Sequence, residues 1–231
     1  MVTARGLVHA YGERRAVDGV DLDLAPGERV ALAGANGAGK STLLRMLATL
    51  VRPKAGTLTV LGHAIPDAAR AARTGIGYLA HDPLVYLDLT ARQNLELYGD
   101  LYGVADRDAR ITDLLDDVGL AVRAEDTVRT FSRGMAQRLA LARMLLHRPR
   151  LLLLDEPHAS LDAAGADRLD RELDAARDDG RAAVIVTHDV ERVARVADRL
   201  VVLRAGRVVL DTPMGDLDPM DVRRLYTGVA P

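Results

Sequence analysis

Residues 34–41 read GANGAGKS, a full match to the phosphate-binding pattern GxxxxGK(S/T). The apolar run ERVALA before this loop is typical of a strand, and the run STLLRMLATL after Lys40 is typical of a helix. Glycines at a strand-to-helix turn let backbone N–H groups, here those of residues 37–41, and the helix dipole face a phosphate. We therefore predict a phosphate-binding loop, or P-loop, formed by Gly34, Ala35, Asn36, Gly37, Ala38, Gly39, Lys40, Ser41 and Thr42.

Lys40 is one of only two lysines in a chain that has 31 basic side chains. An arginine guanidinium is wide and forked, whereas a compact ammonium on a flexible stem can curl back over a loop and act as a point charge. The sequence therefore indicates that Lys40 is chemically required. We expect it to bridge the β and γ phosphates of a nucleotide, and we expect the Ser41 hydroxyl to ligate Mg²⁺.

The composition of the 231-residue chain is that of an ordinary globular protein, with 48% hydrophobic and 28% charged residues. A formal net charge of -2 supplies no basic field, so direct nucleic-acid binding is disfavoured. The absence of cysteine excludes disulfides, thiolate metal sites and a cysteine nucleophile, and it favours the cytoplasm. No apolar stretch approaches the length of a membrane span, so we expect any membrane role to depend on a partner.

The first part of the chain predicts an antiparallel β region and the P-loop, followed by an inserted helical block. Strands are expected at residues 3–8, 20–24, 29–33, 57–61 and 76–80. Helical periodicity runs from 84 to 130, beginning with the capping-box pair Thr90 and Gln93 and an apolar face of Leu95, Leu97 and Leu101. We therefore predict one domain over 1–231, with a catalytic core at 1–82 and 136–231 and a helical subdomain at 83–135.

Helices and strands alternate after residue 132, which predicts a mainly parallel sheet in an α/β fold. The expected helices are 135–146, 163–177 and 190–197, and the expected strands are 150–154, 182–187, 200–203 and 207–210. Ligands of such sheets bind at the carboxyl ends of the strands. The P-loop and the segments LLLLDE and VIVTHD all follow apolar strands, so the fold expectation is a P-loop nucleotide-hydrolysing protein with one phosphate site.

Asp155 and Glu156 follow the apolar run 151–154. We expect Asp155 to hold Mg²⁺ through water and Glu156 to act as the general base on the attacking water. The alternative is that these carboxylates only mark the place where a strand reaches the surface. His188 follows the next strand and is expected to donate to the γ-phosphate or orient the water, the alternative being a structural histidine at a strand end.

Together these motifs resemble the ATP-binding-cassette (ABC) ATPases along essentially the whole chain. Ser132 and Gly134 lie in FSRGMAQRLALAR, where that family has its signature segment, and Ser160 to Asp162 resemble its D-loop. The resemblance implies that two copies pair head to tail, with ATP between the P-loop of one copy and Ser132 and Gly134 of the other. It also implies that Tyr11 stacks on adenine, the alternative being a structural aromatic, and that membrane transporter subunits hold the protein at the inner face of the membrane.

Two departures from the family pattern are notable. Arg133 and Met135 stand where the signature segment commonly has Gly and Gln. His81 occupies the position of the glutamine in the family's Q-loop, and an imidazole nitrogen can accept from or coordinate near the Mg²⁺–water shell. For Arg133 we expect either stronger phosphate binding or a side chain that points into solvent. The alternative for His81 is a loop side chain that is only solvated.

The Q-loop His81-Asp82-Pro83 and the signature segment resemble the ATPase of the haem exporter of cytochrome c maturation, which suggests an export function. Drug-export and lipid-export ATPases share the short cassette and remain the main alternative. A non-transport ATPase of the iron–sulfur assembly type is a second alternative, and a P-loop kinase is a third. The chain lacks the long coiled coil of the chromosome-maintenance type.

Overall fold

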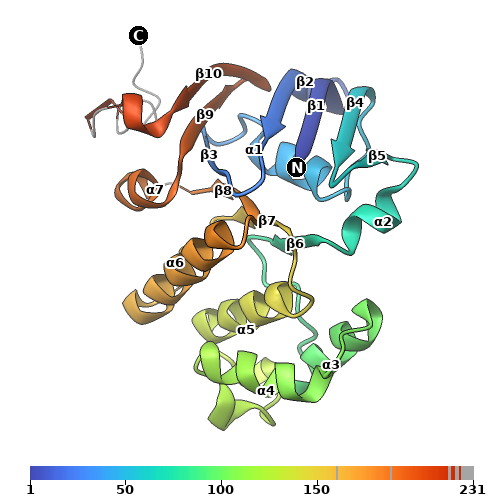
Figure 1. The fold of residues 1–231 in the computed structure, drawn as a ribbon, viewed down its shortest axis with the longest axis vertical. Coiled ribbons are helices and arrows are strands. Elements are labelled where there is room, and N and C mark those ends of the chain that lie inside the picture. The colour runs from blue at the N-terminus through green and yellow to red at the C-terminus, as the bar shows by residue number, and fades with distance from the viewer. Residues whose placement is uncertain (160, 188, 218–219, 222–223, 225–231) are drawn as a thin grey trace.

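The computed structural model describes residues 1–231 apart from 160, 188, 218–219, 222–223 and 225–231. Two β-sheets lie at one end of the molecule, and a group of helices lies at the other (Figure 1). No helix in the described part of the chain is both long and apolar enough to cross a membrane. The P-loop and its helix lie between the two sheets.

The smaller sheet is antiparallel, as predicted, with the strand order β2-β1-β4-β5. Its first two strands extend further than predicted because Gly12 and Glu13 join them as a continuous hairpin. The three-residue strand β5 was too short to be predicted from hydrophobic alternation. The strands are β1 (Val2–Tyr11), β2 (Arg14–Leu24), β4 (Ala55–Val60) and β5 (His63–Ile65).

The larger sheet has the order β10-β9-β3-β8-β7-β6 and is parallel except for β10, which pairs antiparallel with β9. Every residue of β3, β7 and β8 is buried, which explains their uninterrupted apolar sequences. The carboxyl ends of these three strands therefore meet at one edge, as predicted. The strands are β3 (Arg29–Ala33), β6 (Ile76–Leu79), β7 (Leu151–Asp155), β8 (Ala182–Val186), β9 (Arg199–Arg204) and β10 (Arg207–Pro213).

The helices α3, α4 and α5 form the group at the far end of the molecule (Figure 1). Helix α5 begins at Arg133, so the predicted boundary between residues 135 and 136 falls inside a continuous helix. The Arg143 guanidinium of α5 donates to the Tyr78 carbonyl of β6 at 3.1 Å, which ties this group to the larger sheet. The helices are α1 (Lys40–Leu47), α2 (Ala69–Arg73), α3 (Ala91–Tyr102), α4 (Arg107–Asp117), α5 (Arg133–Leu145), α6 (Ala163–Asp178) and α7 (Val190–Val196).

Helix α3 begins with the predicted capping box, in which Thr90 and Gln93 satisfy each other's backbone N–H groups. The predicted apolar face is correct for Leu95, which is fully buried, and wrong for Leu101, which is 72% exposed. The buried positions also include Ala91 and Gly99. Because each helical residue turns the chain by about 100°, Leu101 lies on the opposite side from Gly99.

His147 gives the fold a pH dependence. Its ring stacks on Tyr102 with the centroids 3.8 Å apart, and its Nε2 lies 3.0 Å from the Ile76 carbonyl. Burial lowers the pKa of His147 below its ordinary value of 6.5. The unfolded chain therefore takes up this proton near pH 6.5 while the folded chain does so only at lower pH, so stability falls as the pH drops below that value.

We expect His147→Gln to weaken this acid sensitivity, because the glutamine side chain does not titrate. The measurement is the midpoint of thermal unfolding at a series of pH values from neutral to mildly acidic. His63→Gln, on the edge strand β5, is the control and should follow the wild type. An equally steep loss of stability in His147→Gln and the wild type would contradict the prediction.

Candidate active site

The P-loop turns through backbone conformations that need glycine. Gly34 and Gly39 have φ angles of 139° and 111°. A Cβ on Gly34 would lie 2.2 Å from the Leu203 carbonyl oxygen, and one on Gly39 would lie 2.1 Å from the Ala16 carbonyl oxygen. Neighbouring backbone therefore leaves no room for a side chain at either position.

The Lys40 side chain curls back over this loop, as the sequence predicted. Its Nζ donates to the carbonyl oxygens of Gly34 at 2.7 Å and Ala35 at 3.1 Å. Burial lowers the pKa of Lys40, and the negative charges of Glu156 and Asp155 oppose that shift. A buried ammonium at the amino end of a helix favours a negative ligand such as a phosphate.

One of the predicted backbone donors has a hydrogen-bond partner within the loop. The Ala38 amide donates within the loop to the Ala35 carbonyl at 3.1 Å, because the chain makes a tight turn there. The Ala38 carbonyl in turn accepts from Gly206 at 2.9 Å. The backbone of Ala38 thus braces the loop against β9 and β10, and its side chain is buried.

A cleft of about 740 Å³ opens above the P-loop and brings most of the predicted residues together. Tyr11, half exposed at the end of β1, lies at its rim beside the phosphate-binding loop. Asp155 and Glu156, at the end of β7, line the same cleft, and so does His81. The predicted residues that line the cleft are Tyr11, Asn36, Gly37, Gly39, Lys40, Ser41, Thr42, His81, Asp155 and Glu156.

Asp155 and Glu156 stand at the carboxyl end of β7. Asp155 is the last strand residue and is only 4% exposed. Glu156 has a φ of 53° in the left-handed region, and its N–H donates to the Val186 carbonyl of β8 at 2.8 Å. A non-glycine residue in that region is strained and persists only where its surroundings fix it. The sheet thus fixes the direction in which the Glu156 carboxylate leaves the strand.

The oxygens around Lys40 fit a Mg²⁺ ion. Ser41 supplies a hydroxyl and Asp155 a carboxylate, and Mg²⁺ prefers such hard oxygen ligands together with water and substrate phosphates. Among the described residues, no group of three or more histidine, aspartate and glutamate side chains could hold a metal ion unaided.

Two arginines of the cleft were missed from the sequence. Arg14 of β2 donates from Nη2 to the Gly37 carbonyl at 3.0 Å, and Arg45 of α1 lines the same space. Arg45 could have been found, because it stands one helical turn beyond Ser41. Arg14 had no such signal, because its contact with the P-loop depends on how the β hairpin folds over α1.

Ser132 and Gly134 are not among the residues that line this cleft. Ser132 caps α5, and its Oγ accepts from the Met135 N–H at 3.2 Å. His188 and the D-loop residue Ser160 lie outside the described residues. The role expected for His188 therefore stays a prediction. Within one chain, the P-loop residues and the residues at the end of β7 thus line one cleft. Ser132 and Gly134 lie at the start of α5 and do not line it.

The two departures from the family pattern contact each other. Arg133 Nη2 lies 3.2 Å from His81 Nε2, and both side chains are exposed. An arginine can only donate, so His81 accepts through an unprotonated Nε2. One hydrogen bond thus links the cleft above the P-loop with the start of α5.

We expect His81→Gln to keep ATP hydrolysis near the wild-type rate, because an amide oxygen can replace the accepting nitrogen. His81→Ala removes the acceptor, and we expect a loss of about tenfold, which corresponds to about 1.4 kcal/mol. The measurement is steady-state phosphate release, with His63→Ala as the control. Wild-type activity in His81→Ala would show that the side chain is only solvated.

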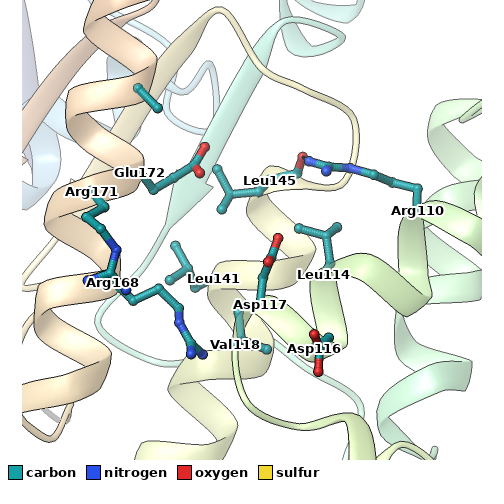
Figure 2. A pocket seen from close by; sticks show the side chains of 11 residues that line it. Arg110, Leu114, Asp116, Asp117, Val118, Leu141, Leu145, Arg168, Arg171 and Glu172 are labelled. Carbon is teal, nitrogen blue, oxygen red and sulfur yellow. Dashed lines mark hydrogen bonds between the residues drawn. The ribbon is translucent and has the colours of Figure 1, made fainter.

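A second cleft, of about 480 Å³, lies between α4 and α6 above α5 (Figure 2). Arg168, Arg171 and Glu172 extend into it from α6, and Arg110 and Asp117 approach from α4. Its lining mixes both signs of charge and includes no glycine-rich loop. None of the predicted site residues that the structure describes lines this second cleft.

A lysine curled over a glycine-rich loop, with two carboxylates at the carboxyl end of β7, defines a P-loop α/β protein. The family model described as "ABC transporter" matches residues 17–159. The chain therefore belongs to the ABC transporter family and is an ABC ATPase domain. The wider fold and enzyme class expected from the sequence are thereby confirmed.

Relatives and solved structures agree with this family. The chain is 38% identical over 218 residues, 94% of its length, to a daunorubicin resistance ATP-binding protein of Streptomyces coeruleorubidus, of which it covers 69%. It is 38% identical over 204 residues, 87% of its length, to Nod factor export ATP-binding protein I of Rhizobium meliloti, of which it covers 61%. A dimeric ATP-binding cassette bound to ADP and phosphate superposes with a TM-score of 0.85 at 27% identity, covering 93% of this chain and 99% of that one.

Proposed function

We propose that this chain binds ATP with Mg²⁺ and hydrolyses it to drive a membrane exporter. The observation that carries the proposal is the meeting of Lys40, Asp155 and Glu156 in one cleft above a glycine-rich loop. A buried ammonium suits the charge of a triphosphate, and a carboxylate beside it suits the activation of water. Family membership supports the same reaction.

Each site residue has a task in this proposal. Lys40 moves from the loop carbonyls to the β and γ phosphates, and Tyr11 stacks on the adenine ring. Ser41 and Asp155, with His81 near the surrounding water, would hold Mg²⁺, which supplies positive charge to the phosphate oxygens. Glu156 accepts a proton from the attacking water, and we retain the prediction that His188 contacts the γ-phosphate.

We further propose that the working form is a head-to-tail dimer, most simply of two identical copies. Ser132 and Gly134 are not among the residues that line the cleft of their own chain, and we propose that they serve the nucleotide of the other copy. The start of α5 offers backbone amides and a hydroxyl, which suit a γ-phosphate. The solved cassette dimer with ADP and phosphate supports this arrangement by likeness.

The proposed partners are integral membrane subunits that hold the protein at the inner face of the membrane. Three large apolar side chains are exposed between β6 and α3: Leu84 at 50%, Tyr86 at 54% and Leu87 at 50%. They follow His81 in sequence, so a partner bound there would contact a segment that begins at the nucleotide cleft. No direct nucleic-acid partner is proposed.

The proposed cargo is an organic molecule handled by a drug-type exporter. The likeness to drug-resistance and Nod factor export ATPases favours this alternative over the haem exporter of cytochrome c maturation. Only His81-Asp82-Pro83 and the signature segment support the haem hypothesis. Cargo binding is assigned to the membrane subunits, so the ATPase sequence carries little information on it.

Deleting the gene in its source organism tests the export proposal. We expect increased sensitivity to, and accumulation of, daunorubicin or another antibiotic in a panel, restored by the wild-type gene and not by Glu156→Gln. Covalently bound haem of c-type cytochromes is measured in the same strains. Loss of that haem with unchanged resistance would favour haem export, and reduced uptake of a nutrient would contradict export altogether.

A further inference from the structure

His158 is a buried histidine for which the proposed reaction has no use. It follows Glu156 by two residues in the loop after β7, and its side chain is only 7% exposed. Its Nε2 lies 3.0 Å from Asp170 Oδ1 in α6, while Nδ1 is buried without a hydrogen-bond partner among the described residues. The geometry indicates that a neutral ring donates from Nε2 to the carboxylate.

Asp170 also binds an arginine of helix α7. Its other oxygen, Oδ2, accepts from Arg192 Nη1 in α7, and the Arg192 side chain is only 15% exposed. Arg192 Nε also faces Asp189 Oδ2 at 3.6 Å, and Asp167 lies at 3.9 Å from Nη1. Asp189 thus connects this group of charges to the loop that follows β8.

Backbone hydrogen bonds connect this network to the loop after β8 and to the loop after β7. The Arg192 N–H donates to Asp189 Oδ1 at 3.0 Å, and the Asp189 N–H donates to Thr187 Oγ1 at 3.2 Å. On the other side, the Leu161 N–H donates to the His158 carbonyl at 3.1 Å. Side chains and backbone therefore form one continuous path between the ends of β7 and β8.

We propose that His158, Asp170 and Arg192, here called the loop brace, set the position of the Glu156 carboxylate against the loop after β8. His158 is a positioning residue that acts through Glu156. This inference rests on the proposed function, because it assigns the brace to ATP hydrolysis.

The strain at Glu156 explains why such a brace is required. Its left-handed backbone needs surroundings that hold it, and the bond from its N–H to the Val186 carbonyl ties it to the sheet at one atom. The Ala159 N–H donates to the Glu156 carbonyl at 3.2 Å, which continues the tight turn towards His158. A buried ion-paired network resists distortion, because losing one partner leaves another charge buried without compensation.

Two variants test the brace in the full chain. His158→Phe fills the ring's volume without a donor. Asp170→Asn keeps the shape, but an NH2 group replaces one of the two oxygens, so either His158 or Arg192 loses its acceptor. The matched control is Glu172→Gln, also on α6, which removes the partly buried pair with Arg181 at 3.1 Å.

We expect each brace variant to lower kcat about tenfold while the KM for ATP and the equilibrium binding of ATP change by less than about twofold. The double variant should be no slower than the single ones, because the residues act as a unit. Glu172→Gln should keep the wild-type kcat. If His158→Phe does not fold, Asp170→Asn gives the same comparison.

Two results would overturn the inference. One is a kcat within about twofold of wild type in a folded brace variant, and the other is a rise in KM with kcat unchanged. Wild-type protein that releases no phosphate would instead refute the proposed function, so the two failures are distinguishable.

Discussion

Replacing Glu156 by Gln is expected to slow ATP hydrolysis about a hundredfold or more while ATP binding is retained. The amide has the same shape as the carboxylate but cannot accept the proton of the attacking water. The backbone of Glu156 is fixed by its bond to Val186, so the variant should keep the same geometry. Lys40 and the P-loop are untouched, which is why affinity should survive.

A second consequence of Glu156→Gln is a trapped dimer. If ATP lies between two copies and is not consumed, the dimer should persist in ATP and separate when the nucleotide is removed. Phosphate release and light scattering after size-exclusion chromatography measure the two effects, with Glu172→Gln as a control that keeps rapid turnover. Fast hydrolysis in Glu156→Gln would remove this residue from the role of general base.

Lys40→Arg is expected to weaken ATP binding about tenfold or more although the charge is kept. The Lys40 ammonium fits in a space bounded by the carbonyls of Gly34 and Ala35, and the side chain is only 7% exposed. A planar, forked guanidinium cannot occupy that space without displacing the loop. The measurement is the Kd for ATP by titration calorimetry, with phosphate release on the same samples.

The chain contains its own control for that substitution. Lys54 is the only other lysine, and it is exposed in the approach to β4, outside the P-loop cleft. Lys54→Arg should therefore bind and hydrolyse ATP as the wild type does. Wild-type affinity in Lys40→Arg would refute the argument that a compact charge is needed.

The sequence was sufficient to predict the P-loop, the parallel sheet and the convergence of Lys40, Asp155 and Glu156. Those features depend on short-range signals: glycines between a strand and a helix, and apolar runs on strands buried on both faces. The capping box of α3 was predictable for the same reason. The exposure of Leu101 was not predictable from the sequence. Two alternative faces of α3 contain leucines, and only packing against the rest of the protein decides which face is buried.

The contacts between distant segments could not be predicted. Arg14 reaches Gly37 only because a hairpin folds over α1, and His158 and Arg192 share Asp170 only because α6 and α7 pack together. The Q-loop histidine His81 was weak evidence for a haem exporter. One loop residue of the ATPase does not determine the cargo that a partner subunit binds. The contact between His81 and Arg133 became evident only in three dimensions.

The most direct test of the proposed ATP-driven dimer is the rate of phosphate release per molecule, measured over a wide range of protein concentration in saturating ATP and Mg²⁺. Because each site is proposed to need Ser132 and Gly134 from a second copy, the rate per molecule should rise with concentration and reach a plateau when the dimer is fully formed. A rate per molecule that is the same at every concentration, with the protein monomeric throughout, would contradict the account.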